Sequence, residues 1–397
     1  MSEPTVLQQF QIPLLYLNNI LALSLKPGPV RILLTLPTLL LLVAQSALRT
    51  DFQYWGEEYP LNVLVIASAF VWVDWIFLAS PDKEAWHKIQ YGKGPEFKVQ
   101  KKENSKVPAS MLGRIWWGMR LATTNRYTGW SNQVKNVPTE VPANYPRWLF
   151  VLRKTLRTVL MWFITGAVTC YTVSTPHGAW RGMEHEKVLV GLHDISMGRK
   201  FVLTWAHIVI TYGSLEMFNA AYGAVAVLSG LANPRDCPSS FGDLRGMYTV
   251  RKAWGEVWHQ MMRRICSAPA TVLARDVFHL RKGTFASKYL QLFVSFAISA
   301  IAHGGASMLA TRSMQDDQAF AAFMAQAIAI LLEDHVIELG RHLGFRDSPM
   351  WRLIGYVWTI VWIGTSMVPY TGSMIDREIW IHDGIMYPDL FGMTFKS

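Results

Sequence analysis

Long runs of apolar residues recur along the chain, and charged residues gather in the segments between them. Residues 32–48 contain no charged side chain, and residues 70–79 contain a single aspartate. Because a helix needs about 20 apolar residues to cross the hydrocarbon core of a bilayer, these runs predict membrane-spanning helices. The spans that we expect are residues 30–48, 59–79, 156–173, 201–231, 287–311, 319–340 and 350–372.

Two segments leave the number and kind of helices open, and a third predicts a helix outside the spans. Residues 201–231 are long enough for one tilted helix or for a helix with a re-entrant piece, and residues 10–25 predict an eighth span or a surface helix. Residues 111–122 predict a helix lying in the membrane interface, where tryptophan and arginine are both stable. Its apolar side chains near one side are Leu112, Ile115, Trp116, Met119 and Leu121, with Arg114 and Arg120 flanking them. We therefore predict an all-α, polytopic membrane domain over residues 1–397, with about seven to nine transmembrane helices and additional interfacial helices.

The amino-acid composition agrees with this class of protein. The chain is 51% hydrophobic and 17% charged, whereas soluble proteins average about 25% charged residues. The N-terminus lacks a basic stretch before a short apolar core, so we expect no cleaved signal peptide and an uncleaved first span as insertion signal. Cys170, Cys237 and Cys266 predict neither a disulfide framework nor a paired-cysteine metal site.

Lysine and arginine concentrate in two polar regions. Residues 81–155 hold 14 Lys or Arg against five Asp or Glu, and residues 232–286 hold nine against four. Since cytosolic loops of membrane proteins carry an excess of Lys and Arg, the charges predict an orientation. Residues 80–155, 232–286 and 341–349 are expected in the cytosol, and residues 174–200, 312–318 and the C-terminus on the far side. The net charge of +10 then reflects cytosolic loops beside the lipid bilayer, and we expect no nucleic-acid partner.

The second polar region contains a compact group of candidate functional residues. Trp254, Trp258 and Met261 have the spacing i, i+4, i+7, which predicts one face of a helix. His259 and Gln260 follow Trp258 directly, and four cations bracket the group: Arg251, Lys252, Arg263 and Arg264. Arginine matches phosphate oxygens with two parallel hydrogen bonds, so this segment could hold a phosphorylated ligand. An interfacial helix whose arginines bind lipid headgroups is an equally good interpretation of the same pattern.

A single histidine, His303, interrupts the uncharged run of residues 293–309. Ionisable residues inside membranes are rare and usually face a protein interior or a watery cavity. An imidazole can take up and return a proton near neutral pH, which suits a general base. Ala302, Gly304, Gly305 and Ala306 surround His303 and permit close approach of a helix or a ligand. A histidine hydrogen-bonded between two helices is the alternative.

The next expected span carries polar residues of its own. Gln326 lies in its middle, and four ionisable residues crowd its cytosolic end: Glu333, Asp334, His335 and Glu338. These side chains could bind a divalent metal, but pairing of the acids with loop arginines is the favoured interpretation. We also expect internal partners for Asp74 and Glu216, which are single acids within spans. Nucleotide-binding glycine motifs and the serine-hydrolase elbow are absent from the sequence.

In these residues the sequence resembles the wax-synthase-like branch of the membrane-bound O-acyltransferases, in the form of the fungal secondary-metabolite acetyltransferases. The resemblance covers residues 245–340 and rests on three elements in order. The first is a loop motif formed by Thr249, Arg251, Trp254, Trp258, His259, Gln260 and Arg263. The second is the stretch 292–303 that ends at His303, and the third is Gln326 followed by Glu333 and Asp334. Ala253 and the small residues after His303 depart from the family pattern, which puts local packing and the acceptor pocket in doubt.

The resemblance implies an acyl-CoA donor and an alcohol acceptor that meet in a tunnel through the helical bundle. It implies that His303 is the general base and that His259 or Gln260 donates a hydrogen bond to the oxyanion. The residues expected to contact acyl-CoA or substrate are Arg251, Trp254, Trp258, Arg263, Arg264, Gln326 and Glu333. No metal and no bound cofactor is expected, with acetyl-CoA as co-substrate. By analogy with the family, the acceptor is a terpenoid or meroterpenoid alcohol in fungal natural-product biosynthesis at the endoplasmic reticulum.

Three alternatives differ from this function. A long-chain wax or sterol ester synthase would use the same site with a fatty-acyl donor. A membrane terpene cyclase would need an apolar cavity, aromatic side chains and a proton donor, roles open to Trp254, Trp258, Glu216 and Asp334. A transporter could use His303 to relay protons. Dependence on a CoA thioester and formation of an ester distinguish the acyltransferase from the last two.

Overall fold

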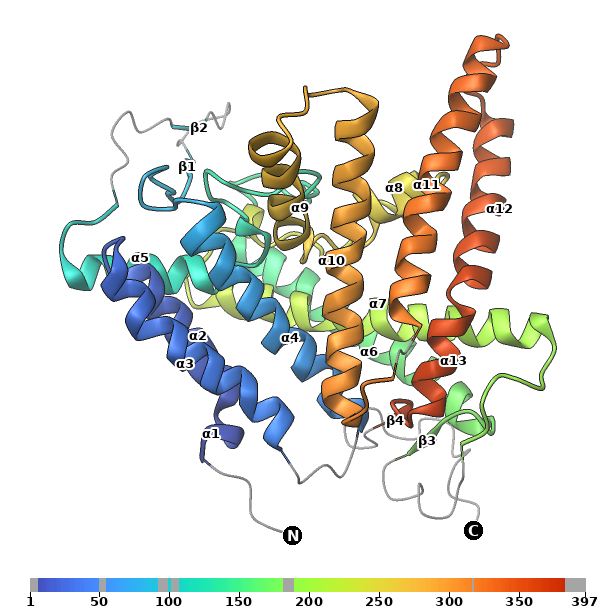
Figure 1. The fold of residues 1–397 in the computed structure, drawn as a ribbon, viewed down its shortest axis with the longest axis horizontal. Coiled ribbons are helices and arrows are strands. Elements are labelled where there is room, and N and C mark those ends of the chain that lie inside the picture. Colours follow the sequence, from blue (N-terminus) through green and yellow to red (C-terminus); the bar gives the residue numbers. More distant parts are fainter. Residues whose placement is uncertain are drawn as a thin grey trace. The chain divides into compact units, whose positions relative to one another are not determined.

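The computed structural model describes residues 6–49, 55–91, 99–100, 107–180, 189–315 and 318–382. Seven helical segments within these residues are long and apolar enough to cross a membrane. They are Pro29–Leu48, Glu58–Leu78, Arg147–Ser174, Met197–Leu228, Phe285–Thr311, Ala319–His342 and Pro349–Asp376. Each predicted span has its counterpart among them, which confirms the all-α membrane fold. Figure 1 shows the helices along the chain.

The chain divides into two compact units, and each is described by itself. Unit 1 comprises Met1–Gln53, Glu58–Val137 and Met261–Gln315, and unit 2 comprises Tyr54–Glu57, Pro138–Gln260 and Asp316–Ser397. The α-helices that lie in unit 1 or begin at its edge are α1 (Val6–Gln9), α2 (Gln11–Ser24), α3 (Pro29–Leu48), α4 (Trp55–Val73), α5 (Met111–Ala122), α9 (Arg263–Val272) and α10 (Phe285–Thr311). Unit 1 also holds π-helical turns at Asp74–Leu78 and Leu273–Val277, a 3₁₀ turn at Asn125–Tyr127, and the antiparallel pair β1 (Gln90–Tyr91) and β2 (Val99–Gln100).

Unit 2 is built around the long helices α6 (Arg147–Ser174) and α7 (Met197–Leu228), which pack along one another. The other α-helices of this unit are α8 (Val250–Lys252), α11 (Ala319–His342), α12 (Pro349–Ser366) and α13 (Val368–Asp376). It also contains 3₁₀ turns at Pro234–Asp236 and Leu244–Gly246, a π-helical turn at Ala253–Val257, and the parallel pair β3 (Ala179–Trp180) and β4 (Ile381–His382). α11 and α12 run side by side (Figure 1).

Two of the open questions about helix number are answered by helix lengths. α7 is one continuous helix of 32 residues, so residues 201–231 do not form a helix with a separate re-entrant piece. α2 has 14 residues and is about 21 Å long, less than the roughly 30 Å of a hydrocarbon core. It packs against α3 and α5, and an eighth span is therefore not supported. The last span is divided between α12 and α13 at Met367, where Pro369 follows in the first turn of α13.

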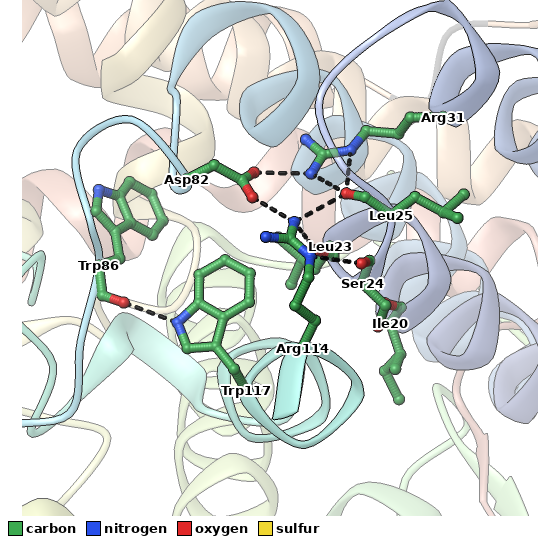
Figure 2. A network of polar contacts seen from close by, with 9 residues as sticks. All are labelled: Ile20, Leu23, Ser24, Leu25, Arg31, Asp82, Trp86, Arg114 and Trp117. Carbon is green, nitrogen blue, oxygen red and sulfur yellow. Dashed lines mark hydrogen bonds and ion pairs between the residues drawn. The ribbon is translucent and has the colours of Figure 1, made fainter. Parts of the chain in front are cut away.

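Arg114 corrects the prediction for the helix at 111–122. Leu112 and Trp116 are exposed, as an interfacial helix requires, but Leu121 and Arg114 are buried on another side. In Figure 2, Arg114 and Arg31 converge on the carboxylate of Asp82. The same guanidinium groups donate to the carbonyl oxygens at the end of α2: Arg114 Nε to Ser24 O at 2.7 Å, Arg114 Nη2 to Leu25 O at 2.9 Å and Arg31 Nε to Leu25 O at 3.1 Å. Two cations share one carboxylate here because the carbonyl end of a helix also carries partial negative charge.

Candidate active site

His303 lies in the last third of α10 and is half-buried. Its Nδ1 atom is 2.8 Å from the hydroxyl oxygen of Tyr59 on α4. The two rings are nearly parallel, with their centroids 6.4 Å apart and an interplanar angle of 24°. Tyr59 gives no signal in the sequence, because it is 244 residues from His303 and belongs to no recognisable motif. The structure thus adds a hydroxyl partner to the one histidine of this span.

The small residues around His303 serve helix packing. Ala302 and Ala306 are completely buried. A Cβ atom at Gly305 would lie 3.0 Å from Cδ1 of Ile66, which is closer than ordinary van der Waals contact. Glycine at position 305 therefore lets α10 approach α4 closely at Ile66.

The 249–260 segment of unit 2 is not the continuous helix that the tryptophan spacing predicted. Thr249 caps the short helix α8, since its side chain accepts a hydrogen bond from Lys252 N at 3.0 Å. The helix then widens into a π-helical turn and ends at Trp258, whose ψ of 151° is extended. A new helix begins only at Arg263, so Trp254, Trp258 and Met261 do not share one helix face. The prediction was wrong because tertiary hydrogen bonds to this segment override its local periodicity.

Gln260 closes the end of that turn. Its side-chain nitrogen donates to the carbonyl oxygens of Trp258 at 2.6 Å and Trp254 at 3.2 Å, and its side chain is buried. The Gln260 amide nitrogen, which was expected to donate to an oxyanion, thus donates to backbone carbonyl oxygens in this structure. His259 instead stays within an aromatic cluster, with ring centroids 5.5 Å from Trp258 and 5.9 Å from Phe241. The predicted grouping of Trp258, His259 and Gln260 is confirmed, and Phe241 joins it.

Gln326 and Glu333, separated by two turns on α11, hold the 249–260 segment in place. Gln326 is completely buried, and its carbonyl oxygen accepts from Trp254 Nε1 at 3.3 Å and Trp362 Nε1 at 3.0 Å. Its amide nitrogen donates to Ser366 Oγ at 2.9 Å. All these partners belong to the protein, so Gln326 acts as a support for Trp254 rather than as an evident ligand contact.

The Glu333 carboxylate caps helix α8 from outside that helix. Its Oε1 accepts from Val250 N at 2.8 Å and from Trp358 Nε1 at 3.1 Å, and its Oε2 accepts from Arg251 N at 3.0 Å. The first N–H groups of a helix have no partner within the helix, and a negative charge there is stabilising. The Arg251 guanidinium forms two hydrogen bonds with Asp334, at 2.7 and 2.6 Å. Pairing of the α11 acids with a loop arginine is confirmed for Asp334.

The remaining ionisable residues at this end of α11 have local partners. Glu338 pairs within its own helix with Arg341 at 3.3 Å and His342 at 3.2 Å. His335 is exposed, and its Nδ1 lies 2.7 Å from Leu331 O. In the described parts of the chain, no group of three or more His, Cys, Asp or Glu side chains could hold a metal ion.

Arg264, in unit 1, is also held by protein groups. Its Nε lies 2.8 Å from Oδ2 of Asp74, which is almost completely buried, and its guanidinium carbon lies 5.0 Å from the ring centroid of Trp86. Burial opposes the charge of Arg264, but the hydrogen bond and the charge of Asp74 outweigh it, so the pKa of Arg264 is raised. The expected internal partner of Asp74 is confirmed. Arg264, like Arg251, thus stabilises the protein itself, which disfavours both as primary phosphate contacts.

A buried ionic cluster in unit 2 fixes the loop that carries Phe241. Glu216 on α7 is completely buried, 3.0 Å from Arg157 Nε, and accepts from Ser240 N at 2.8 Å. Glu140 accepts from Lys154 Nζ at 2.8 Å and from Ser239 N at 3.0 Å. Burial alone would raise the pKa of Glu140, but Lys154 and the neighbouring arginines outweigh it and lower that pKa. The predicted internal pairing of Glu216 is confirmed, and with Arg157 and Ser240 as partners it is unsuited to the proton-donor role of a cyclase.

Comparison with known proteins defines the class to which these features belong. Residues 237–325 match the model of the family described as membrane bound O-acyl transferase. The chain is 46% identical to acetyltransferase sirH of Leptosphaeria maculans over 381 residues, covering 96% of this chain and 94% of sirH. It is 30% identical to acetyltransferase eriL of Hericium erinaceus over 256 residues, covering 64% of each chain. O-Mevalon transferase macI of Penicillium terrestre is 26% identical over 344 residues, covering 82% of this chain and 75% of macI.

The chain therefore belongs to the membrane-bound O-acyltransferase family. It is an integral, multi-pass membrane enzyme that transfers an acyl group to a hydroxyl group. The matched region contains both the 249–263 motif and His303, which confirms the resemblance seen in the sequence.

Proposed function

We propose that the protein acetylates a hydroxyl group of a lipophilic alcohol, with acetyl-CoA as donor and His303 as general base. The observation that carries the proposal is an imidazole on a membrane-spanning helix, with its Nδ1 atom at hydrogen-bonding distance from a hydroxyl. The acetyl group follows the names of the relatives sirH and eriL. The acceptor is a terpenoid- or meroterpenoid-type alcohol of fungal secondary metabolism, and the enzyme works as one membrane domain in the endoplasmic reticulum.

In the proposed reaction, His303 Nε2 removes the acceptor's hydroxyl proton as the hydroxyl oxygen attacks the thioester carbonyl. For Nε2 to accept this proton, Nδ1 must carry hydrogen, and Tyr59 accepts the hydrogen bond from it. The tetrahedral intermediate expels the CoA thiolate, which takes the proton back from His303. The family resemblance assigns the hydrogen bond to the oxyanion to His259, a contribution worth about 3 kcal/mol in other enzymes. A water-poor site also limits hydrolysis of the thioester.

Product analysis tests this function directly. Membranes from a host that expresses the chain are incubated with acetyl-CoA and a panel of lipophilic alcohols, and products are analysed by mass spectrometry. We expect an alcohol to gain the mass of one acetyl group only when both substrates are present. Because macI is named for a different transferred group, longer acyl-CoA donors are compared in parallel. Conversion without a thioester would indicate a cyclase, and transport without any ester would indicate a carrier.

Replacing Arg263 by alanine should raise the KM for acetyl-CoA about tenfold or more, with little change in kcat. A hydrogen bond to a charged group contributes about 1.5–3 kcal/mol, and a donor phosphate is already bound in the ground state. The matched control is Arg281→Ala, an exposed arginine of the same polar region. Equal KM values for the two variants would remove Arg263 from the phosphate site.

Replacing Tyr59 by phenylalanine should lower kcat about tenfold and leave both KM values unchanged. The ring remains, but His303 loses the acceptor that fixes its protonated nitrogen; partners that orient metal-bound histidines in this way contribute a factor of about 10 to 100. Tyr171→Phe, at an exposed position on α6, makes the same chemical change elsewhere in the membrane region. An unchanged kcat in Tyr59→Phe would show that this hydroxyl does not position His303.

A further inference from the structure

Asn62 on α4 has a buried side-chain amide. Its side chain is 1% exposed, and among the described residues neither Nδ2 nor Oδ1 has a hydrogen-bond partner. More than nine in ten buried polar groups in proteins find a partner, so an amide with both ends unpaired requires an explanation. A group that binds only during the reaction is one such explanation.

The position of Asn62 places this amide on the face of α4 that meets α10. It follows Tyr59 by three residues and precedes Ile66 by four, and residues at this spacing share a helix face. Tyr59 contacts His303, and Ile66 is the neighbour that a Cβ at Gly305 would meet. Asn62 therefore lies between two contacts with the part of α10 that carries the candidate base.

One ion pair and one hydrogen bond link this part of α4 to α10 through Arg49. Glu58, beside Tyr59, pairs with Arg49 at 2.6 Å. Arg312, at the end of α10, donates to the backbone oxygen of the same Arg49 at 3.0 Å. The two helices are thus tied to one another near Tyr59, and the unpaired amide is part of a fixed packing arrangement.

A second unpaired polar atom lies on the facing helix. Ser307 is completely buried, and its Oγ has no hydrogen-bond partner among the described residues. It follows His303 by four residues, so the two side chains lie on the same side of α10. Unpaired polar atoms therefore lie on both helices close in sequence to the Tyr59–His303 pair, three residues after Tyr59 on α4 and four residues after His303 on α10.

We propose that Asn62 is an oxyanion donor of the acyl-transfer reaction. Its Nδ2–H group donates a hydrogen bond to the carbonyl oxygen of the bound thioester. This hydrogen bond becomes stronger as the oxygen becomes negatively charged during the attack. A side-chain amide is suited to this task, because it donates without carrying a charge that would need its own partner. The inference rests on the proposed role of His303, since Asn62 would bind the thioester carbonyl that is attacked by the hydroxyl oxygen that His303 deprotonates.

The test uses the opposite effects that Asn62→Leu should have on activity and stability. Leucine has a similar volume and removes unpaired polar atoms, so the thermal midpoint of the purified protein should stay equal or rise. kcat should fall about 100-fold, as for other oxyanion donors, with a nearly unchanged KM for acetyl-CoA. The matched control is Thr359→Val on α12, which also replaces a buried, unpaired polar atom and should keep full turnover.

Two results would overturn the inference. An unchanged kcat shows that Asn62 does not touch the reacting carbonyl, and parallel losses of thermal midpoint and kcat show that it only supports helix packing. Asn62→Ala is measured alongside: if Asn62→Leu does not accumulate as folded protein, the kcat and thermal midpoint of Asn62→Ala test the inference instead. His303→Ala is assayed in the same series: if that variant remains active, the proposed general base is wrong, whatever Asn62→Leu does.

Discussion

His303→Ala should lower kcat by about 10²–10⁴-fold, the usual contribution of a general base, while the folded protein accumulates normally. Alanine is the best helix former and His303 is already flanked by alanine and glycine, so α10 should keep its structure. The measurements are initial rates with saturating acetyl-CoA and acceptor, and the thermal midpoint of the purified protein. His335→Ala, at an exposed position on α11, is the matched control and should behave like the unmodified enzyme.

His303→Gln separates the two interpretations that the sequence left open. Glutamine can still form a hydrogen bond with Tyr59, but it cannot accept a proton near neutral pH. If His303 only links two helices, His303→Gln should retain most of the activity. If His303 is the base, His303→Gln should be as inactive as His303→Ala. Activity of His303→Gln above about one tenth of normal would contradict the catalytic role, given the size of general-base effects.

Features that depend on local sequence were predicted well. The seven spans could be predicted from the length of the apolar runs alone. An unbroken apolar run crosses a membrane as a helix, because a helix forms all backbone hydrogen bonds within the segment. The internal partners of Asp74 and Glu216 could also be expected, since an unpaired charge in such a helix is costly. In both cases a general physical constraint leaves few alternatives.

Features that depend on tertiary contacts were missed or predicted wrongly. The tryptophan spacing at 254–261 fits a helix, but hydrogen bonds that this segment donates to Gln326 and Glu333 impose a short helix, a π-helical turn and an extended residue. Tyr59 and Asn62 lie in a span whose apolar pattern gives no reason to single them out. Their importance comes from the facing helix, more than 200 residues away in sequence, which local periodicity does not encode.

The supporting hydrogen bonds also change the meaning of the family motif. Thr249, Gln260, Gln326 and Glu333 bind backbone or tryptophan groups of the protein, and Arg251 pairs with Asp334. These motif residues build and hold the 249–260 segment. Positioning of Trp254, Trp258 and His259 is then their shared effect, and fewer motif residues are left to contact acyl-CoA than the sequence suggested.

Glu333→Gln should destabilise the protein by about 1.5–3 kcal/mol and lower turnover with it. The carboxylate accepts hydrogen bonds on both oxygens, from Val250 N and Trp358 on one and from Arg251 N on the other. Glutamine has one acceptor oxygen, so in either orientation its NH₂ group faces an N–H donor. The start of α8 then loses its cap, and the following turn with Trp254 should shift.

Stability and structure of this segment are measured separately from activity. The thermal midpoint of the purified protein should fall, and tryptic cleavage after Arg251 and Lys252 should become faster, because their backbone is no longer held. Glu338→Gln is the matched control on the same helix: Glu338 is exposed and pairs with Arg341 and His342 on the helix surface, and such surface pairs contribute little. If Glu333→Gln keeps its midpoint and cleavage rate but raises the KM for acetyl-CoA, Glu333 is a ligand contact. A fall in midpoint and kcat together, with unchanged KM, assigns Glu333 to holding the 249–260 segment. Only the capping role connects resistance of this backbone to trypsin with the rate of turnover.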